Sequence, residues 1–137
     1  MTSASLACAP ELKRGWCQYA SVQAAGCAPV VKAFNEGSER TEPWVDPHTN
    51  AYGLRVPSPL GGFLCLRALR ATHGTAIAIA EEEMEQATRA LAASSGIDVC
   101  PEGGAAWAAF LKLRDSGFIR PADQVVVFNT GTGLKYR

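Results

Sequence analysis

Two hydroxyls and two glycines alternate over residues 130–133 (TGTG), directly after an apolar run at residues 125–128 and Asn129. The four apolar residues, three of them valine, predict a buried strand of a parallel sheet. Glycine lets the backbone turn tightly and approach another group closely. Because ligands of open α/β sheets bind just past the carboxyl ends of strands, Thr130 and Gly131 form a candidate ligand loop. An ordinary strand-end turn explains the same spacing, and the pattern alone leaves both interpretations open.

A second candidate loop, residues 101–104 (PEGG), offers a carboxylate at Glu102. It follows residues 97–100 (IDVC), for which we expect a brief strand. Loops that follow parallel strands emerge at the same edge of a sheet, so Glu102 is expected to lie near the TGTG loop. A third segment, residues 52–55 (YGLR), is a candidate to join them.

Known catalytic motifs do not account for these loops. None of them matches the phosphate-binding patterns GxxxxGK[ST] or GxGxxG. His48 and His73 have no recognisable nucleophilic-triad context around them. The residues by themselves therefore indicate a small-ligand edge and not a particular reaction.

Apolar periodicity predicts the elements that position the loops. Helices are expected where apolar residues recur every three or four positions, and strands where short apolar runs end at turns. The predicted order is a strand at 19–23, a helix at 27–35, a helix from 64 towards Gly74, a strand at 75–80, a helix from 81 to Gly96, a helix around 107–114 and the final strand. Three glutamates at 81–83 suit the positive end of a helix dipole better than an acidic binding site. This alternation is typical of an α/β fold, an open, mostly parallel sheet with helices on both faces in three αβα layers.

Composition narrows the class of protein. The 137 residues suffice for one domain, and 13 basic residues balance 13 acidic ones, so charge gives no reason to expect nucleic acid or membrane as a partner. No apolar segment is long enough to span a membrane, and the N-terminus does not read as a signal peptide. The five cysteines form no CxxC pair, which disfavours a metal site and fits a reducing cytoplasm.

Several stretches resemble the C-terminal part of threonine synthase, a tryptophan-synthase-beta-like enzyme of fold type II. They occur in the family's order, and with the segments between them they cover residues 16–137, whereas residues 1–15 do not match. They are VQAAGCAPVVKAF at 22–34, PHTNAYGLRVPSPLG at 47–61, VCPEGGAAWAAFLKL at 99–113 and VVVFNTGTGLKYR at 125–137.

The resemblance implies a pyridoxal 5'-phosphate cofactor and a small amino-acid substrate. Threonine synthase is a lyase that converts O-phosphohomoserine and water to threonine and phosphate, with the cofactor as electron sink. By the same resemblance, Thr130 faces the pyridine nitrogen of the cofactor and Gly131 follows it in the loop. Glu102 matches a carboxylate near the ring, Gly53 a small residue whose backbone passes the ring, and Arg55 a possible substrate contact.

The chain also departs from the family. Family members are more than twice as long, and their Schiff-base lysine and phosphate-cradling loop lie in the N-terminal half, so no catalytic residue is assigned here. The four lysines, Lys13, Lys32, Lys112 and Lys135, do not sit in the matching context. We therefore expect a fragment that is inactive alone, or one half of a split enzyme completed by a separate N-terminal half or in a homodimer. A non-catalytic remnant or binding domain, and an ammonia-lyase or dehydratase of the same fold, stay open as alternatives.

Overall fold

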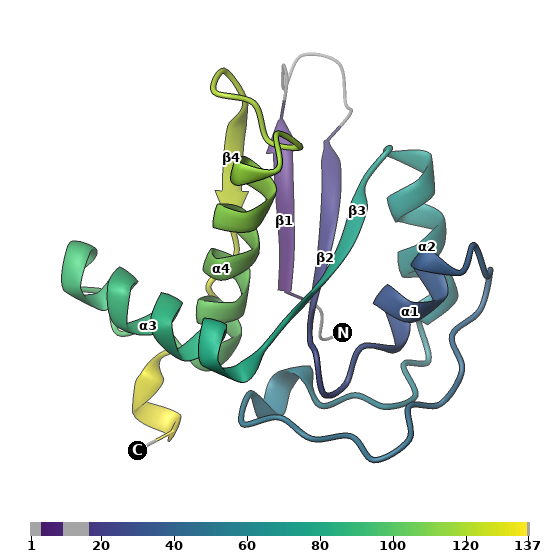
Figure 1. The fold of residues 1–137 in the computed structure, drawn as a ribbon, viewed down its shortest axis with the longest axis horizontal. Coiled ribbons are helices and arrows are strands. Elements are labelled where there is room, and N and C mark those ends of the chain that lie inside the picture. Colours follow the sequence, from purple (N-terminus) through teal and green to yellow (C-terminus); the bar gives the residue numbers. More distant parts are fainter. Residues whose placement is uncertain (1–3, 10–16, 137) are drawn as a thin grey trace.

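A four-stranded sheet organises the protein in the computed structural model, which describes residues 4–9 and 17–136 (Figure 1). The strands lie in the order β3-β2-β1-β4 and comprise β1 (Ala4–Ala9), β2 (Gln18–Ala24), β3 (Thr75–Ile79) and β4 (Gln124–Val127). β2 and β3 are parallel, whereas β1 is antiparallel to both of its neighbours. Three of these four strands therefore run in one direction, which confirms the mostly parallel sheet. β1 escaped prediction because its sequence, ASLACA, has no β-branched or aromatic residue.

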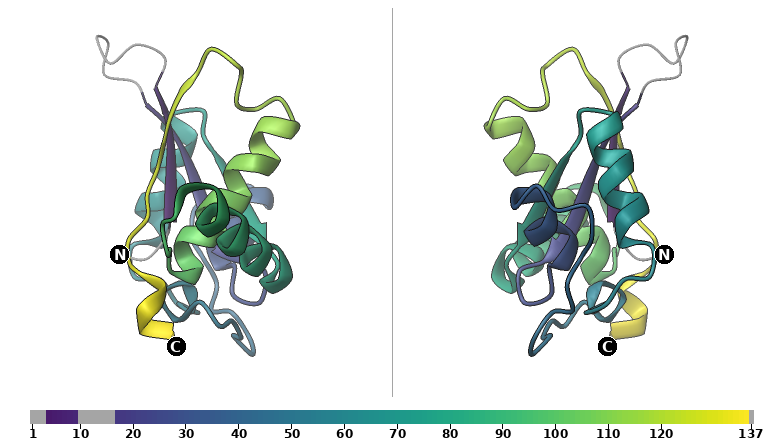
Figure 2. Two further views of the ribbon diagram at one scale, coloured as in Figure 1. Left: turned by 90° about the vertical axis from the view of Figure 1, so that its left-hand side faces the viewer. Right: turned by 90° about the vertical axis from the view of Figure 1, so that its right-hand side faces the viewer.

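Helices lie on both faces of the sheet, as predicted for three αβα layers. Figures 1 and 2 show α4 (Pro101–Asp115) on one side of the strands and α2 (Gly62–Ala71) on the other. Two short 3₁₀ helices, η1 and η2, flank the carboxyl end of the sheet. The helices are α1 (Pro29–Asn35), η1 (Tyr52–Leu54), α2 (Gly62–Ala71), α3 (Glu81–Ser95), α4 (Pro101–Asp115) and η2 (Gly133–Tyr136). None of the helices among the described residues is long and apolar enough to cross a membrane.

Small side chains bring α4 close to the sheet. Val22 of β2 and Ile79 of β3 are fully buried in one cluster with alanines of α4. Alanine costs little side-chain entropy in a helix and keeps the two layers near each other. Gly104 has the same effect between helices, because a Cβ there would lie 2.7 Å from the Met84 carbonyl oxygen of α3. The start of α4 is thus fixed against both the sheet and α3.

The opposite face is covered by α1 and α2, which share a second cluster with Ala76 of β3. Buried Gln23 joins β2 to the start of α1, since its side-chain oxygen accepts hydrogen bonds from the backbone N–H groups of Val30 and Val31, at 2.8 and 3.1 Å. These bonds satisfy donors at the helix start that have no partner inside the helix.

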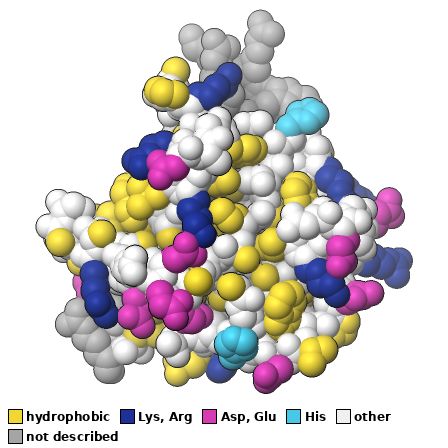
Figure 3. All heavy atoms as spheres, viewed as in Figure 1, with side chains coloured by type: hydrophobic (Ala, Val, Ile, Leu, Met, Phe, Trp, Pro, Cys, Tyr) yellow, Lys and Arg dark blue, Asp and Glu magenta, His cyan; other side chains and the backbone are white. Residues whose placement is uncertain are grey.

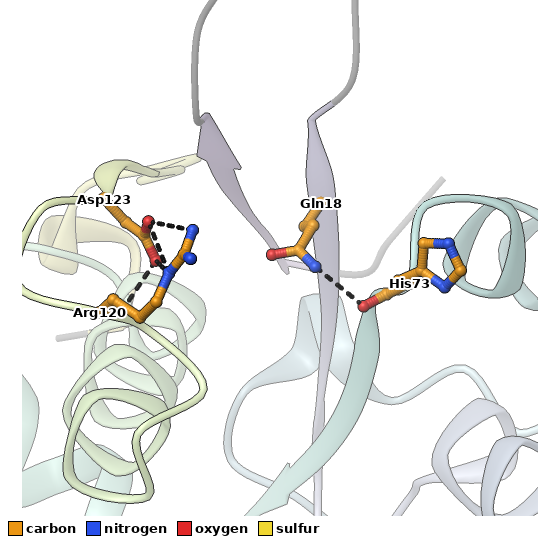
Figure 4. A network of polar contacts seen from close by, with 4 residues as sticks. All are labelled: Gln18, His73, Arg120 and Asp123. Atoms are coloured by element: carbon orange, nitrogen blue, oxygen red, sulfur yellow. Dashed lines mark hydrogen bonds and ion pairs between the residues drawn. The ribbon is translucent and has the colours of Figure 1, made fainter.

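Polar contacts also fix two turns at the far end of the strands (Figure 4). The Gln18 side-chain amide donates to the His73 carbonyl at 3.3 Å, which joins β2 to the turn before β3. Arg120 pairs with Asp123 at 3.0 Å in the turn before β4. Both contacts fix residues that directly precede a strand. They lie at the end of the sheet opposite the carboxyl edge, where the candidate site is.

Three local predictions were wrong. Residues 97–100 form only an isolated bridge between Val99 and Thr132, because the stretch has no neighbouring strand to pair with. Residues 101–104 are the first turn of α4, where Pro101 suits the first helical position. β4 is an edge strand bonded only to β1 and is half exposed, not buried; Val126 is 52% exposed. The placement of the three glutamates in the first turn of α3 is confirmed.

Candidate functional site

The buried carboxylate of Glu102 joins three segments at the carboxyl edge of the sheet. Glu102 is the second residue of α4 and is 7% exposed. Its Oε1 atom accepts a hydrogen bond from the Gly53 N–H of η1 at 2.8 Å. The same atom accepts one from the Tyr136 hydroxyl of η2 at 2.5 Å. Because a buried charge is costly unless it is hydrogen-bonded, these donors stabilise the carboxylate at this position.

Glycine is required where η1 meets Glu102. A Cβ on Gly53 would lie 2.7 Å from Glu102 Oε1, closer than side chains approach one another. The neighbouring Tyr52 stacks on Tyr136, with ring centroids 5.9 Å apart and planes 15° apart. The Arg55 guanidinium lies 5.0 Å from the centroid of the Tyr52 ring, within cation–π distance. η1 and η2 are therefore joined by a row of planar groups beside the carboxylate.

Backbone bonds hold the TGTG loop against the start of α4. The Cys100 N–H donates to the Gly131 carbonyl at 3.2 Å, and the Gly133 N–H donates to the Asp98 carbonyl at 3.0 Å. The Cys100 thiol contacts the Asn129 side-chain oxygen at 3.7 Å. These bonds place the TGTG loop beside the residues that directly precede the PEGG segment, and a bridge and a helix start replace the predicted strand and loop.

Electrostatics at this edge favour one ionised carboxylate among neutral groups. Burial raises the pKa of Glu102, but hydrogen bonds from Tyr136, Cys100 and Gly53 outweigh it, so the pKa lies below its usual value. Burial and the hydrogen bond to Glu102 raise the pKa of Tyr136 to about 12. Burial also raises the pKa of the Cys100 thiol. At neutral pH the site therefore presents an acceptor carboxylate, a donor phenol and an un-ionised thiol.

The predicted site residues lie together to different degrees. Gly53 and Glu102 are bonded directly. Thr130 is exposed and lies in the loop whose Gly131 carbonyl is bonded to Cys100, two residues before Glu102. Gly131 bonds Cys100 through its carbonyl. Arg55 contacts Tyr52 of the same cluster twice, through its guanidinium over the ring and through its backbone N–H, which donates to the Tyr52 carbonyl at 3.2 Å.

Sequence reasoning missed Tyr136 and Cys100. Tyr136 follows the TGTG loop by three residues, and its position beside Glu102 depends on the turn of η2, for which the sequence has no periodic signal. The scattered cysteines suggest small core residues, and Cys100 is indeed buried, at 2% exposure. Its contacts with Asn129 and Gly131 follow from the chain reversal between α4 and the C-terminus.

Two of the three described lysines form ion pairs with carboxylates other than Glu102, and the third lines a cavity beside Tyr136. Lys32 pairs with Glu42 at 3.1 Å, and Lys112 pairs with Glu83 at 2.6 Å. Lys135 lines a cavity of about 580 Å³ together with Tyr52 and Tyr136. Among the side chains of residues 17–136, no group of three or more His, Cys, Asp or Glu could hold a metal ion.

Comparison with known proteins identifies similar chains. Residues 4–131 match the family described as "Pyridoxal-phosphate dependent enzyme". The chain is 37% identical over 114 residues to the threonine synthase of Methanosarcina acetivorans, covering 83% of this chain and 28% of that protein. It is 33% identical over 114 residues to the threonine synthase of Methanocaldococcus jannaschii, with the same coverage. It is 36% identical over 115 residues to the chloroplastic threonine synthase 2 of Arabidopsis thaliana, covering 83% of this chain and 22% of the relative.

A solved structure shares the fold. The crystal structure of a threonine deaminase from T.th. superposes with a TM-score of 0.57 at 21% identity, covering 70% of this chain and 34% of that one. The chain spans 28% or less of the length of the three threonine synthases named above. The similarity therefore concerns one part of each of these longer relatives.

Proposed function

The chain belongs to the pyridoxal-phosphate-dependent enzyme family, and on that premise we propose that it supplies one side of the cofactor site in a threonine synthase. The reaction proposed is the conversion of O-phosphohomoserine and water to threonine and phosphate. The threonine synthases that match at 33–37% identity favour this reaction over an ammonia-lyase or dehydratase of the same fold. The observation that carries the proposal is the meeting of Gly53, Glu102 and the TGTG loop at one edge.

The residues at this edge fit one side of the cofactor ring. Pyridoxal phosphate, when bound, supplies the electron sink of the reaction. The exposed hydroxyl of Thr130 is the proposed partner of the pyridine nitrogen, with Gly131 beside it. A hydroxyl donates to a neutral nitrogen, whereas an ionised carboxylate in its place would favour protonation of the ring. In this proposal Thr130 therefore limits how strongly the ring withdraws electrons.

Glu102 and Gly53 have a positioning role in the same proposal. Glu102 is held ionised by its donors, so it orients the η1 backbone at Gly53, where the ring passes. The absence of a side chain at Gly53 leaves room for the Glu102 carboxylate, which approaches the η1 backbone to 2.8 Å. Arg55, held over Tyr52, is the proposed contact for an anionic group of the amino-acid substrate.

The lysine that bonds the cofactor and the loop that binds its phosphate are proposed to come from outside these 137 residues. Lys112 and Lys32 are engaged in ion pairs, which fits structural rather than catalytic roles. A preceding segment, a separate N-terminal half or a second subunit of a homodimer are the sources to compare. We propose a cytoplasmic location for the complete enzyme, in line with the scattered cysteines.

Complementation tests this function directly. The 137-residue chain would be produced alone and together with the N-terminal part of a threonine synthase relative, and phosphate release from O-phosphohomoserine would be measured. We expect turnover only in the combined sample, and a loss of about tenfold or more when Thr130→Ala removes one hydrogen bond, with Thr132→Ala as the matched control. Turnover by the chain alone, or no co-purification and no threonine in the combined sample, would count against the proposal.

A parallel assay separates the reaction from its alternatives. The combined sample would be given threonine or serine, and release of ammonia and a 2-oxo acid would be followed. A threonine synthase releases phosphate from O-phosphohomoserine faster than ammonia from threonine. Faster ammonia release would favour the dehydratase instead.

A further inference from the structure

An open groove of about 960 Å³ lies between α2 and the loop at residues 39–41. Its walls include three arginines, Arg40, Arg67 and Arg70, and the exposed apolar side chains of Leu60 and Phe63. None of the groove residues belongs to the cluster around Glu102, so the groove lies outside the function proposed above.

Positive charge exceeds negative charge among the residues that line this groove. Arg67 and Arg70 are three residues apart on α2, which places them on one face of the helix. In the part of the chain that the structure describes, neither they nor Arg40 form an ion pair with a carboxylate. Glu39 is the single acidic residue among those that line the groove. Figure 3 shows Lys and Arg side chains on the α1–α2 side of the molecule, the right of the view, where Asp and Glu side chains lie between them.

One arginine is held in place before any ligand arrives. The Arg70 Nη2 atom donates to the Ser38 carbonyl at 2.6 Å, and the Ser38 hydroxyl donates to the Arg40 carbonyl at 2.8 Å. These bonds fix the loop to α2 and leave most of the guanidinium N–H donors for other acceptors. A preorganised arginine loses less entropy on binding than a free one.

The groove wall has an apolar part as well. Leu60 is 97% exposed and Phe63 is 46% exposed. Thr41 packs on the backbone of Gly62, where a Cβ would lie 2.7 Å from its hydroxyl, so the loop closes on the first turn of α2. Apolar surface beside guanidinium groups suits a ligand with both an apolar body and a charged end.

We infer that this groove binds a small organic anion, in which a carboxylate or phosphate group is carried by an apolar body. Guanidinium groups bind both of these planar or tetrahedral oxyanions through paired N–H···O bonds. The volume lies within the range of small-molecule sites, about 300–1,000 Å³. The anionic group contacts Arg40, Arg67 and Arg70, and the apolar body lies on Leu60 and Phe63.

Calorimetric titration with simple probes tests the inference. Phenyl phosphate and benzoate carry the two candidate oxyanions on the same ring, inorganic phosphate lacks the apolar body, and benzyl alcohol lacks the charge. We expect saturable binding of phenyl phosphate or benzoate and weaker binding of the other two probes. Comparison of the affinities for phenyl phosphate and benzoate shows whether the site prefers a phosphate or a carboxylate group.

Charge-matched variants assign the binding to the groove. We expect Arg67→Gln and, on the exposed loop, Arg40→Gln each to lower the affinity for the aromatic anion about tenfold. This is the effect of losing one charge-assisted hydrogen bond. Arg89→Gln removes the same charge from α3, where Arg89 pairs with Glu85 at 3.1 Å, and is expected to leave binding unchanged. Amide chemical shifts that change at residues 39–41 and 60–71 would support the location.

Several outcomes overturn the inference. They are the lack of saturation by both aromatic anions, equal binding of benzyl alcohol, equal binding of inorganic phosphate, and equal weakening by Arg89→Gln. If Arg67→Gln unfolds the chain, the Arg40→Gln variant decides, since Arg40 lies on the exposed loop. Wild-type affinity in a folded Arg40→Gln variant would then exclude Arg40 from the site and contradict the inference.

Discussion

Tyr136 and Glu102 come from opposite ends of the α4-to-C-terminus segment, and the Tyr136 hydroxyl donates to the carboxylate oxygen that also accepts from Gly53. The bond closes η2 over the start of α4. Glu102 is 7% exposed, so its charge depends on donors from η1 and η2 rather than on water. The fold of the C-terminal residues and the protonation state of the carboxylate are therefore linked.

Removal of the phenol hydroxyl should destabilise the protein. Tyr136→Phe keeps the stacked ring but takes away one donor from a buried charge, at a cost of about 1–3 kcal/mol in the free energy of unfolding. Urea denaturation of the wild type and the variant measures this difference in the free energy of unfolding. Tyr52→Phe is the control, because Tyr52 stacks in the same pair without donating to Glu102. Equal stabilities of the two variants would show that the hydroxyl contributes nothing.

A methyl group at Gly53 should displace η1 from Glu102. The added Cβ would lie 2.7 Å from Glu102 Oε1, so the backbone must move and the 2.8 Å bond lengthens or breaks. We expect Gly53→Ala to cost about 1–3 kcal/mol, as overpacking does. Gly61→Ala is the control, because a Cβ there meets no atom within 4 Å. Thermal unfolding compares the stabilities of the two variants. A smaller loss of stability in Gly53→Ala than in Gly61→Ala would contradict the close approach of Gly53 to Glu102.

The pH dependence of stability should have two limits set by this pair. The folded pKa of Glu102 lies below its usual 4.5, so its contribution is present above that value and is lost as the pH falls through the folded pKa. The pKa of Tyr136 rises from 10.0 to about 12, so its contribution is present below pH 10 and is lost between these values.

Variants separate the two limits. Glu102→Gln should flatten the acid limb of a plot of unfolding free energy against pH, and Tyr136→Phe should flatten the limb between pH 10 and 12. Absorbance of the tyrosinate ion provides a second readout, since Tyr136→Phe should remove a titration step near pH 12. An alkaline limb that is identical in wild type and Tyr136→Phe would refute the link.

Particular residues show how far the sequence predicts this structure. The helix from Glu81 to Gly96 was predictable, because carboxylates mark its start and Gly96 ends it with a positive φ of 72°. The strand at 19–23 was predictable as well and extends by one residue at each end in β2. In these elements the local signal and the tertiary packing agree.

Elements at the sheet edge were harder to predict. Residues 97–100 read as a strand, but a strand needs a partner, and only Val99 finds one in Thr132. β4 reads as buried because its residues are apolar, yet its position at the edge depends on β1, which carries no sequence signal. The bond between Tyr136 and Glu102 joins residues 34 apart, a separation beyond any local pattern. Tertiary pairing determines these features.

Pyridoxal phosphate added to the 137-residue chain should leave no single lysine modified in full. Lys32 is held by Glu42 at 3.1 Å, an ion pair that raises the pKa of Lys32 and stabilises its charged, unreactive form, and Lys112 is held by Glu83 at 2.6 Å. Borohydride reduction followed by peptide mass spectrometry measures the modified fraction at each lysine. Lys135 is the informative exception, because it lines the 580 Å³ cavity beside Tyr136. A stoichiometric adduct at Lys135 that disappears in Lys135→Arg would place the bonding lysine within this chain and refute the proposal that it comes from elsewhere.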